Sequence, residues 1–370
     1  MIPEGDAGVA EGRIAVAMSG GVDSSVAALL LHGQGRDLVG LCLQLHGRSE
    51  GDPGRLGRCG SPQHFLDARR VADQVGFPFH VLNMEKEFRR AVLDDFVVEY
   101  STGRTPLPCA HCNSEVKFGE LMRRAEELGC QQVATGHYAR LRRDPATGRT
   151  RLLRGKDREK DQSYFLFGMT REQLDRALFP VGDLLKKEVR TLAAEAGLRV
   201  ADKPESMDIC FLSGEGYRGF LKKELGDAAP GAGEFVDRDG RVLGTHDGVH
   251  LFTVGQRRGL GLSGEQAWYV LEIRGEKRQV VLGREQEQYR SSCSVPRPNW
   301  IGMEPPRRSV EAAVQIRHRH PGCEAVVEPD GDGSIRIRFR RPQRAVTPGQ
   351  AAVFYREDEV LGGGFIGSTH

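Results

Sequence analysis

The chain has 370 residues, with 53 Lys and Arg against 51 Asp and Glu, 39% hydrophobic residues and eight cysteines. This length predicts two or three domains, and the balanced charge argues against disorder and gives no general affinity for nucleic acid. No run approaches ~18 consecutive apolar residues, and residues 1–13 are acidic and Gly-rich, so we expect neither a membrane span nor a secretory signal. Eight cysteines are too few for a disulfide scaffold, which suits a cytoplasmic protein.

The first 200 residues alternate between short apolar strands and helical segments. Strands are expected at 13–18, 38–45, 79–83 and 132–136, and helices at 26–31, 65–75 and 118–128. A Gly- and Arg-rich loop is expected at 46–61 and a Pro-containing loop at 101–113. This alternation predicts an α/β domain with a doubly wound parallel sheet.

After residue 210 turn signals recur about every 8–12 residues, which is typical of β structure. Short strands are expected at 249–254, 268–274 and 279–282, in a small and mostly β central domain. A Pro-rich break at 295–298 precedes strand candidates at 310–318, 324–328, 334–340 and 351–355, which predict a C-terminal barrel of six strands or fewer. The expected domains are therefore 1–210, 211–290 and 291–370.

The segment Ser19–Ser25 (SGGVDSS) lies between a predicted strand and a predicted helix. Its glycines let backbone N–H groups converge on an anion, and the helix N-terminus adds its positive dipole end. It lacks the Gly-Lys-Ser/Thr of a Walker loop and the Gly-x-Gly-x-x-Gly of a dinucleotide site. A plain turn with a helix cap is the alternative, but the strand, the helix and the three serines favour a phosphate site.

This segment resembles the PP-loop of ATP pyrophosphatases, which cleave ATP to AMP and pyrophosphate while they activate a carbonyl oxygen. Six further motifs resemble, in the same order, the tRNA-specific 2-thiouridylase family; they lie at 103–113, 134–140, 160–166, 206–211, 253–261 and 361–364. The resemblance implies a PP-loop domain, a central β domain and a C-terminal β-barrel. It also implies action on the wobble uridine of glutamine, glutamate and lysine tRNAs.

The resemblance assigns binding residues as well. For ATP they are Ala17, Met18, Ser19, Gly20, Gly21, Val22, Asp23, Ser24, Leu43 and Gly136. For tRNA they are Leu107, Pro108, Cys109, His137, Lys160, Asp161, Gln162, Arg317, His318 and Gln350. Asp23 is the expected ligand of Mg²⁺, since a carboxylate beside phosphates suits that ion.

Two cysteines match the family's reactive thiols. Cys112 matches the nucleophile and Cys210 the carrier of a persulfide, and both roles require a thiolate close to its partner. The alternative is that both are structural. Cys210 precedes an apolar pair, whereas Cys112 is expected in the Pro-containing loop, where a thiol is hard to bury.

Cys109 departs from the family's commoner pattern, in which an Asp holds this place, so no carboxylate role can be carried over. Three interpretations stay open: a reducible Cys-x-x-Cys pair with Cys112, a zinc half-site, or a [4Fe–4S] cluster completed by Cys210. Zinc is the weakest because no second ligand pair follows, and residue type favours the cluster, whose open iron would bind hydrosulfide. Cys42, Cys130, Cys293 and Cys323 are expected to be structural, and Cys59 is undecided.

Residues 333–356 contain six arginines and no acid. Arg336, Arg338 and Arg340 alternate along a predicted strand, which places them on one face. Such a face suits phosphate contacts that position RNA, although a solvated charged face has the same pattern.

The favoured interpretation is that ATP adenylates the C2 oxygen of a tRNA uridine and that sulfur then displaces AMP. The sulfur would come from a Cys210 persulfide, loaded by a donor protein or a sulfide source, or from a cluster-bound hydrosulfide. No membrane or DNA partner is expected. A PP-loop synthetase acting on another carbonyl is the alternative enzyme, and a non-catalytic RNA-binding module is the third class, which an intact phosphate loop disfavours.

Overall fold

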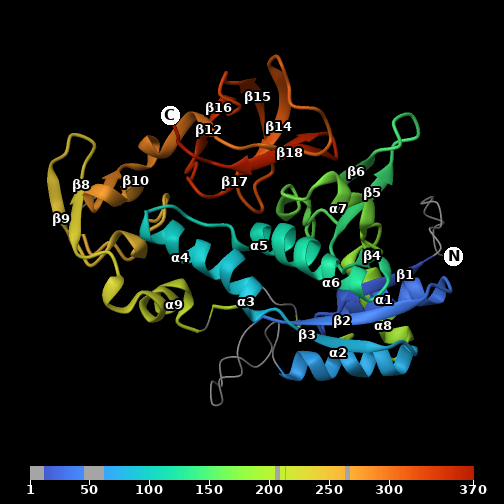
Figure 1. Cartoon of the computed structure of the whole chain (residues 1–370). Coiled ribbons are helices and arrows are strands. Elements are labelled where there is room, and N and C mark those ends of the chain that lie inside the picture. The colour runs from blue at the N-terminus through green and yellow to red at the C-terminus, as the bar shows by residue number, and fades with distance from the viewer. Residues whose placement is uncertain (1–11, 46–61, 205–208, 213, 263–266) are drawn as a thin grey trace. The chain divides into compact units, whose positions relative to one another are not determined.

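The computed structural model describes residues 12–45, 62–204, 209–212, 214–262 and 267–370, shown in Figure 1. The expected loop at 46–61, with Cys59, and the motif residues 206–208 lie outside these ranges. The chain forms two compact units. The first comprises Met1–Ala91, Cys109–Phe211 and Asp358–Val360, and the second comprises Val92–Pro108, Leu212–Glu357 and Leu361–His370.

The first unit is built on a parallel sheet, as the sequence predicts. Its five strands have the order β3 (Phe79–Asn83), β2 (Leu38–Gln44), β1 (Arg13–Ala17), β4 (Cys130–Ala134) and β7 (Ala177–Leu178). The near-continuous apolar sequences of β1 and β2 suit strands covered on both faces. The expected α/β architecture is confirmed.

Helices cover this sheet. α1 (Val22–Gly33), α2 (Pro62–Val75) and α8 (Lys186–Glu195) share one apolar core with β1 and β2. In Figure 1, α2 lies on one side of the sheet and α6 (Leu121–Glu127) on the other. Since the strands are parallel, the carboxyl ends of β1, β2 and β4 lie at one edge of the sheet.

The segment expected to be a loop at 101–113 is partly helical. α5 (Pro108–His111) continues without a break into the π-helical segment η3 (Cys112–Glu120) and then into α6. The prediction of a helix over 118–128 therefore began too late. Pro108 explains why the helix begins earlier than predicted. Proline suits the first position of a helix because its φ is already helical and because an N–H at that position would have no acceptor within the helix.

The second unit contains a four-stranded sheet in the order β10 (Tyr269–Arg274), β11 (Gln279–Gly283), β8 (Gly233–Val236) and β9 (Val242–His246). Its core includes Phe235, Phe252 and Val280. The expected strands at 268–274 and 279–282 are present. The strand expected at 249–254 is wrong, because residues Val249–Leu251 form a 3-10 turn.

The same unit contains the C-terminal strands. Their order is β12 (Tyr289–Val295), β16 (Ile335–Arg344), β15 (Cys323–Pro329), β14 (Val310–Gln315), β17 (Ala351–Arg356) and β18 (Glu359–Phe365). The four predicted segments correspond to β14–β17, whereas β12 and β18 were not predicted. Alternating buried residues of β16, such as Ile335, Ile337 and Phe339, face the core of this sheet.

The remaining elements are α3 (Glu85–Phe88), η2 (Arg89–Leu93), α4 (Asp94–Ser101), β5 (Ala139–Arg143), β6 (Thr150–Arg154), η4 (Ser163–Phe165), α7 (Arg171–Arg176), α9 (Gly216–Leu225), η5 (Gly226–Ala228), η7 (Gly275–Lys277), η8 (Glu285–Gln288) and β13 (Asn299–Trp300). None of the helices in the described ranges is both long and apolar enough to cross a membrane.

A core substitution in the second unit should be costly. Phe354 of β17 is fully buried, and its ring lies 5.3 Å from that of Trp300. Phe354→Ala should lower the free energy of unfolding by about 3–5 kcal/mol, because it removes buried surface and leaves a cavity. Val98→Ala is the control, since Val98 is 58% exposed, and should change it by at most about 0.5 kcal/mol. Denaturant titration measures both, and equal losses would contradict this description of the core.

Candidate active site

The predicted phosphate loop connects β1 to α1. Gly20 has φ +70°, and a Cβ atom there would lie 2.3 Å from the carbonyl oxygen of His64, so only glycine fits. The Ser19 amide donates to Ser24 Oγ at 3.2 Å, and the Ser25 hydroxyl donates to the Gly21 carbonyl at 2.8 Å. Gly21 precedes α1 and offers no capping oxygen, so the first-turn N–H groups can bind an anion.

Asp23 lies in the first turn of α1 and is paired. Lys186 Nζ donates to its two carboxylate oxygens at 2.7 and 2.8 Å, and the Tyr138 hydroxyl donates to Oδ1 at 2.7 Å. The Lys186 side chain is only 11% exposed, against 32% for Asp23. Asp23 therefore holds the ammonium of Lys186 beside the first turn of α1.

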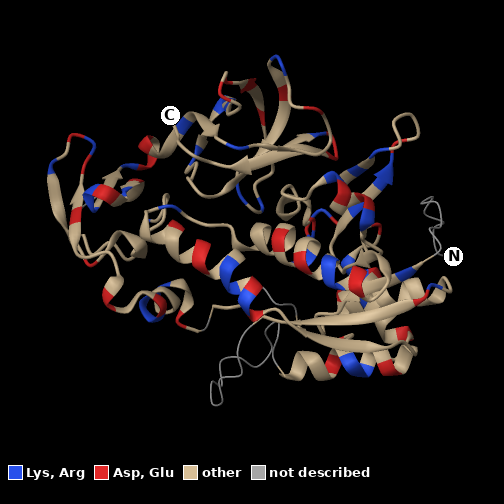
Figure 2. Cartoon of the chain, viewed as in Figure 1, with Lys and Arg blue, Asp and Glu red and all other residues tan. Residues whose placement is uncertain are grey.

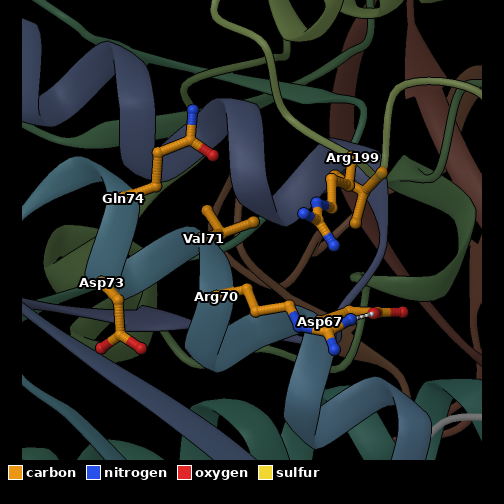
Figure 3. Close-up of a pocket in the computed structure, with 7 residues that line it drawn as sticks. Asp67, Arg70, Val71, Asp73, Gln74 and Arg199 are labelled. Atoms are coloured by element: carbon orange, nitrogen blue, oxygen red, sulfur yellow. Dashed lines mark ion pairs between the residues drawn. The ribbon is translucent and has the colours of Figure 1, made fainter.

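A second lysine supports the loop from outside. Lys203 Nζ donates to the Gly20 carbonyl at 2.9 Å and to Asp67 Oδ2 at 2.6 Å. Partial burial alone would raise the pKa of Asp67, but the hydrogen bond and charge of Lys203 lower it overall. Asp67 also lines a hollow of about 260 Å³ with Arg70 and Arg199, shown in Figure 3.

The other expected ATP contacts lie at the same edge of the sheet. Ala17 ends β1, buried Met18 follows it, and Leu43 lies near the end of the adjacent β2. Gly136 follows β4, and a Cβ atom there would be 2.6 Å from the Ser24 nitrogen. The structure thus brings together the residues expected to bind ATP.

His137 occupies a buried position directly after Gly136. Its ring lies 6.0 Å from that of Phe118 and 5.8 Å from that of Phe179. Thr135 Oγ1 is 2.7 Å from its Nδ1, and Lys117 Nζ is 3.4 Å from its Nε2. Burial, and then the charge of Lys117, hold the pKa of His137 well below its usual value, so the imidazole is neutral.

Cys109 and Cys112 lie on the helix that begins at Pro108. Cys112 is buried, so the expectation of a thiol in an open loop is wrong, whereas Cys109 is exposed. Surrounding protein atoms raise the pKa of Cys109, and the charge of Lys117 lowers it in part. Cys109 is therefore a thiol that a substrate can reach and that is protonated at neutral pH.

Cys210 is partly exposed, and the structure places its neighbour near the same helix. The ring of Phe211 packs edge-on against that of Phe88 in α3, at 6.1 Å, and α3 contacts η3. All seven described cysteines are thiols rather than disulfides. Cys112 and Cys210 are thus parts of the same compact unit.

The thiols do not form a metal site in this arrangement. Over residues 12–45, 62–204, 209–212, 214–262 and 267–370, no three His, Cys, Asp or Glu side chains are placed so that they could hold a metal ion. A [4Fe–4S] cluster needs thiolates gathered around iron. Cys109, Cys112 and Cys210 therefore do not fit a cluster as they lie here.

The tRNA contacts expected in the first unit include residues with internal roles. The Asp161 carboxylate accepts hydrogen bonds from the Gly155 amide at 2.9 Å and from Arg154 at 2.9 Å. Gln162 Oε1 accepts from the Tyr138 amide at 3.0 Å. Asp161 and Gln162 thus shape the turn that carries Lys160.

In the second unit, Gln350 Nε2 donates to the carbonyls of Thr105 and Pro106 at 3.2 and 3.1 Å. It therefore fixes the segment that precedes buried Leu107 and Pro108. Arg317 donates to the Arg344 carbonyl at 3.1 Å, and His318 follows it in a turn after β14.

The three arginines of β16 do not form a purely basic face. Arg338 pairs with Glu328, Arg340 pairs with Glu311, and Arg336 lies 3.8 Å from Asp330. Figure 2 shows basic and acidic segments next to one another on these strands. The predicted basic face was incomplete because the acidic partners of these arginines belong to other strands and turns. They lie outside residues 333–356, which contain no acid.

Three lysines of the site were not predicted. Lys117, Lys186 and Lys203 come from different segments, and Lys186 is 163 residues from the Asp23 that it binds. A lone lysine carries no sequence signal for such pairing. Tyr138 lies within the motif at 134–140, but that motif predicted binding roles only for Gly136 and His137.

Comparisons with known proteins cover nearly the whole chain. The model "tRNA methyl transferase HUP domain" matches residues 12–214, "tRNA methyl transferase PRC-barrel domain" matches 218–284, and "Aminomethyltransferase beta-barrel domain" matches 290–366. Among solved structures, a 4-thiouridine synthetase in complex with RNA and ATP has 17% identity, a TM-score of 0.34, and covers 58% of this chain and 51% of its own.

Two curated relatives are much more similar. The tRNA-specific 2-thiouridylase MnmA of Koribacter versatilis is 47% identical, over 95% of this chain and 98% of its own. The protein of the same name from Geobacter metallireducens is 49% identical, over 96% of each chain. With this identity over nearly its full length, and with its phosphate loop and two thiols in one α/β unit, the chain belongs to the tRNA-specific 2-thiouridylase family.

Proposed function

We propose that this protein is an ATP-dependent tRNA-uridine 2-sulfurtransferase that thiolates the wobble uridine of glutamine, glutamate and lysine tRNAs. The observation that carries the proposal is one compact unit holding both a phosphate loop paired to Lys186 and the thiols Cys112 and Cys210. A PP-loop synthetase would need the loop but not the thiols. The full-length similarity to 2-thiouridylases supports the first function over the second.

The first step would be adenylation. The uridine C2 oxygen attacks the α-phosphorus, an O–P bond forms, and pyrophosphate leaves with the electrons of the broken phosphoanhydride bond. The N–H groups at the start of α1 hold the phosphates, and Lys186 adds positive charge beside them. Mg²⁺ on the phosphates would further neutralise their charge, with Asp23 as its protein carboxylate.

The second step would transfer sulfur. The terminal sulfur of a Cys210 persulfide attacks C2, and the C2–O bond breaks as AMP leaves with the electron pair. The Cys112 thiolate then attacks the Cys210 sulfur, which releases 2-thiouridine and leaves a Cys112–Cys210 disulfide. A dithiol reductant reduces that disulfide, and a persulfide donor protein reloads Cys210.

The domains would divide this work. We assign ATP and chemistry to residues 1–210, a central β domain to 211–290 and tRNA binding to 291–370. The proposed contacts with RNA are Lys160, Arg317 and His318, together with Leu107, Pro108, Cys109 and His137. We propose a cytoplasmic enzyme with tRNA as its nucleic-acid partner and no membrane partner.

The nucleotide chemistry is tested at Asp23. Asp23→Asn should lower AMP formation by roughly 10²-fold or more, because Lys186 loses the carboxylate that holds it beside the phosphates. Labelled ATP, tRNA and a persulfide donor are incubated with each variant, and AMP and 2-thiouridine are quantified by chromatography and mass spectrometry. Asp73→Asn, on the exposed side of α2, is the matched control and should match the parent. Release of ADP and orthophosphate would refute the proposed reaction.

The sulfur chemistry is tested at the three cysteines. With persulfide chemistry, Cys112→Ser and Cys210→Ser should abolish thiolation, whereas Cys109→Asp should retain it because that position carries no sulfur. Anaerobically purified protein should contain substoichiometric iron and sulfide. The full iron and sulfide content of a cluster, lost together with activity in Cys109→Ser, would instead establish the cluster mechanism.

A further inference from the structure

Lys117 places a cation beside His137 with no acidic partner in the part of the chain that the structure describes. Its Nζ lies 3.4 Å from His137 Nε2, and no ion pair of Lys117 with a carboxylate occurs among the described residues. The imidazole that holds it is neutral, so Nε2 accepts from the ammonium and Nδ1–H donates to Thr135 Oγ1 at 2.7 Å. A partly buried cation with a neutral partner is suited to bind an anion from a ligand.

The Lys117 ammonium lies near residues assigned to both proposed half-reactions, adenylation and sulfur transfer. His137 directly follows Gly136, whose backbone abuts Asp23 and Ser24 of the phosphate loop. Lys117 also lies about two helical turns after Cys109 on one continuous helix, and its charge acts on that thiol. The ammonium therefore extends from the helix that carries Cys109 and Cys112 to the His137 ring, which directly follows the glycine packed against the phosphate loop.

We propose that Lys117 binds the α-phosphate of the adenylated uridine and stabilises AMP as it leaves during sulfur transfer. This inference rests on the proposed function. When the C2–O bond breaks, its electron pair passes to the phosphate oxygen of AMP, and the ammonium offsets the charge that develops there. Pyrophosphate leaves earlier, at the loop with Lys186, so Lys117 acts in the second half-reaction.

The test separates the two half-reactions in single turnover. Lys117→Met should leave the pyrophosphate burst within about threefold of the parent, slow 2-thiouridine formation roughly 10²-fold, and let adenylated tRNA accumulate. Lys117→Arg, which keeps the charge, should recover most of the transfer rate. Lys86→Met, an exposed lysine of α3, is the matched control. Circular dichroism melting verifies that the variants are folded.

AMP alone provides a second readout that needs no tRNA. Lys117→Met should weaken AMP binding about tenfold in calorimetric titration, whereas Lys86→Met should leave it unchanged. Equal losses in both half-reactions, or transfer and AMP affinity at the parental level, would overturn the assignment of Lys117. A parent enzyme that forms no AMP and no 2-thiouridine would overturn the proposed function instead, so the two failures are distinct.

Discussion

The ion pair of Lys186 with Asp23 is the contact that connects the phosphate loop to the rest of the first unit. It joins the first turn of α1 to the first residue of α8, and the Tyr138 ring lies 5.5 Å below the same ammonium. A Walker loop carries its lysine within the loop itself. Here the positive charge around the phosphates comes from distant segments, so the nucleotide site exists only when the sheet and its helices are assembled.

Much of this site could be predicted from the sequence because its signals are local. The glycines and serines of 19–25 lie between a strand and a helix, and Gly136 follows a strand that is adjacent in the sheet. Lys186 and Lys203 could not be predicted, since their partners are brought close only by folding. The arginines of β16 were misjudged for the same reason, because their acids belong to other strands and turns.

Cys109 affects the electrostatics of the site because a protonated thiol carries no charge. A carboxylate at this place would be an acidic group on the same helix as Lys117, whereas a protonated thiol is not. The ammonium therefore keeps its charge available for a ligand. The same thiol explains why the sequence alone suggested a cluster, since it adds a third cysteine to Cys112 and Cys210.

Lys203 has a consequence for the position of Cys210. It is bound to the phosphate loop through the Gly20 carbonyl, and Cys210 follows it by seven residues in the chain. A fully extended segment of that length spans at most about 25 Å. Cys210 is thus linked to the phosphate loop by a short piece of backbone and the hydrogen bond of Lys203, and its Cα stays within that distance of the Lys203 Cα.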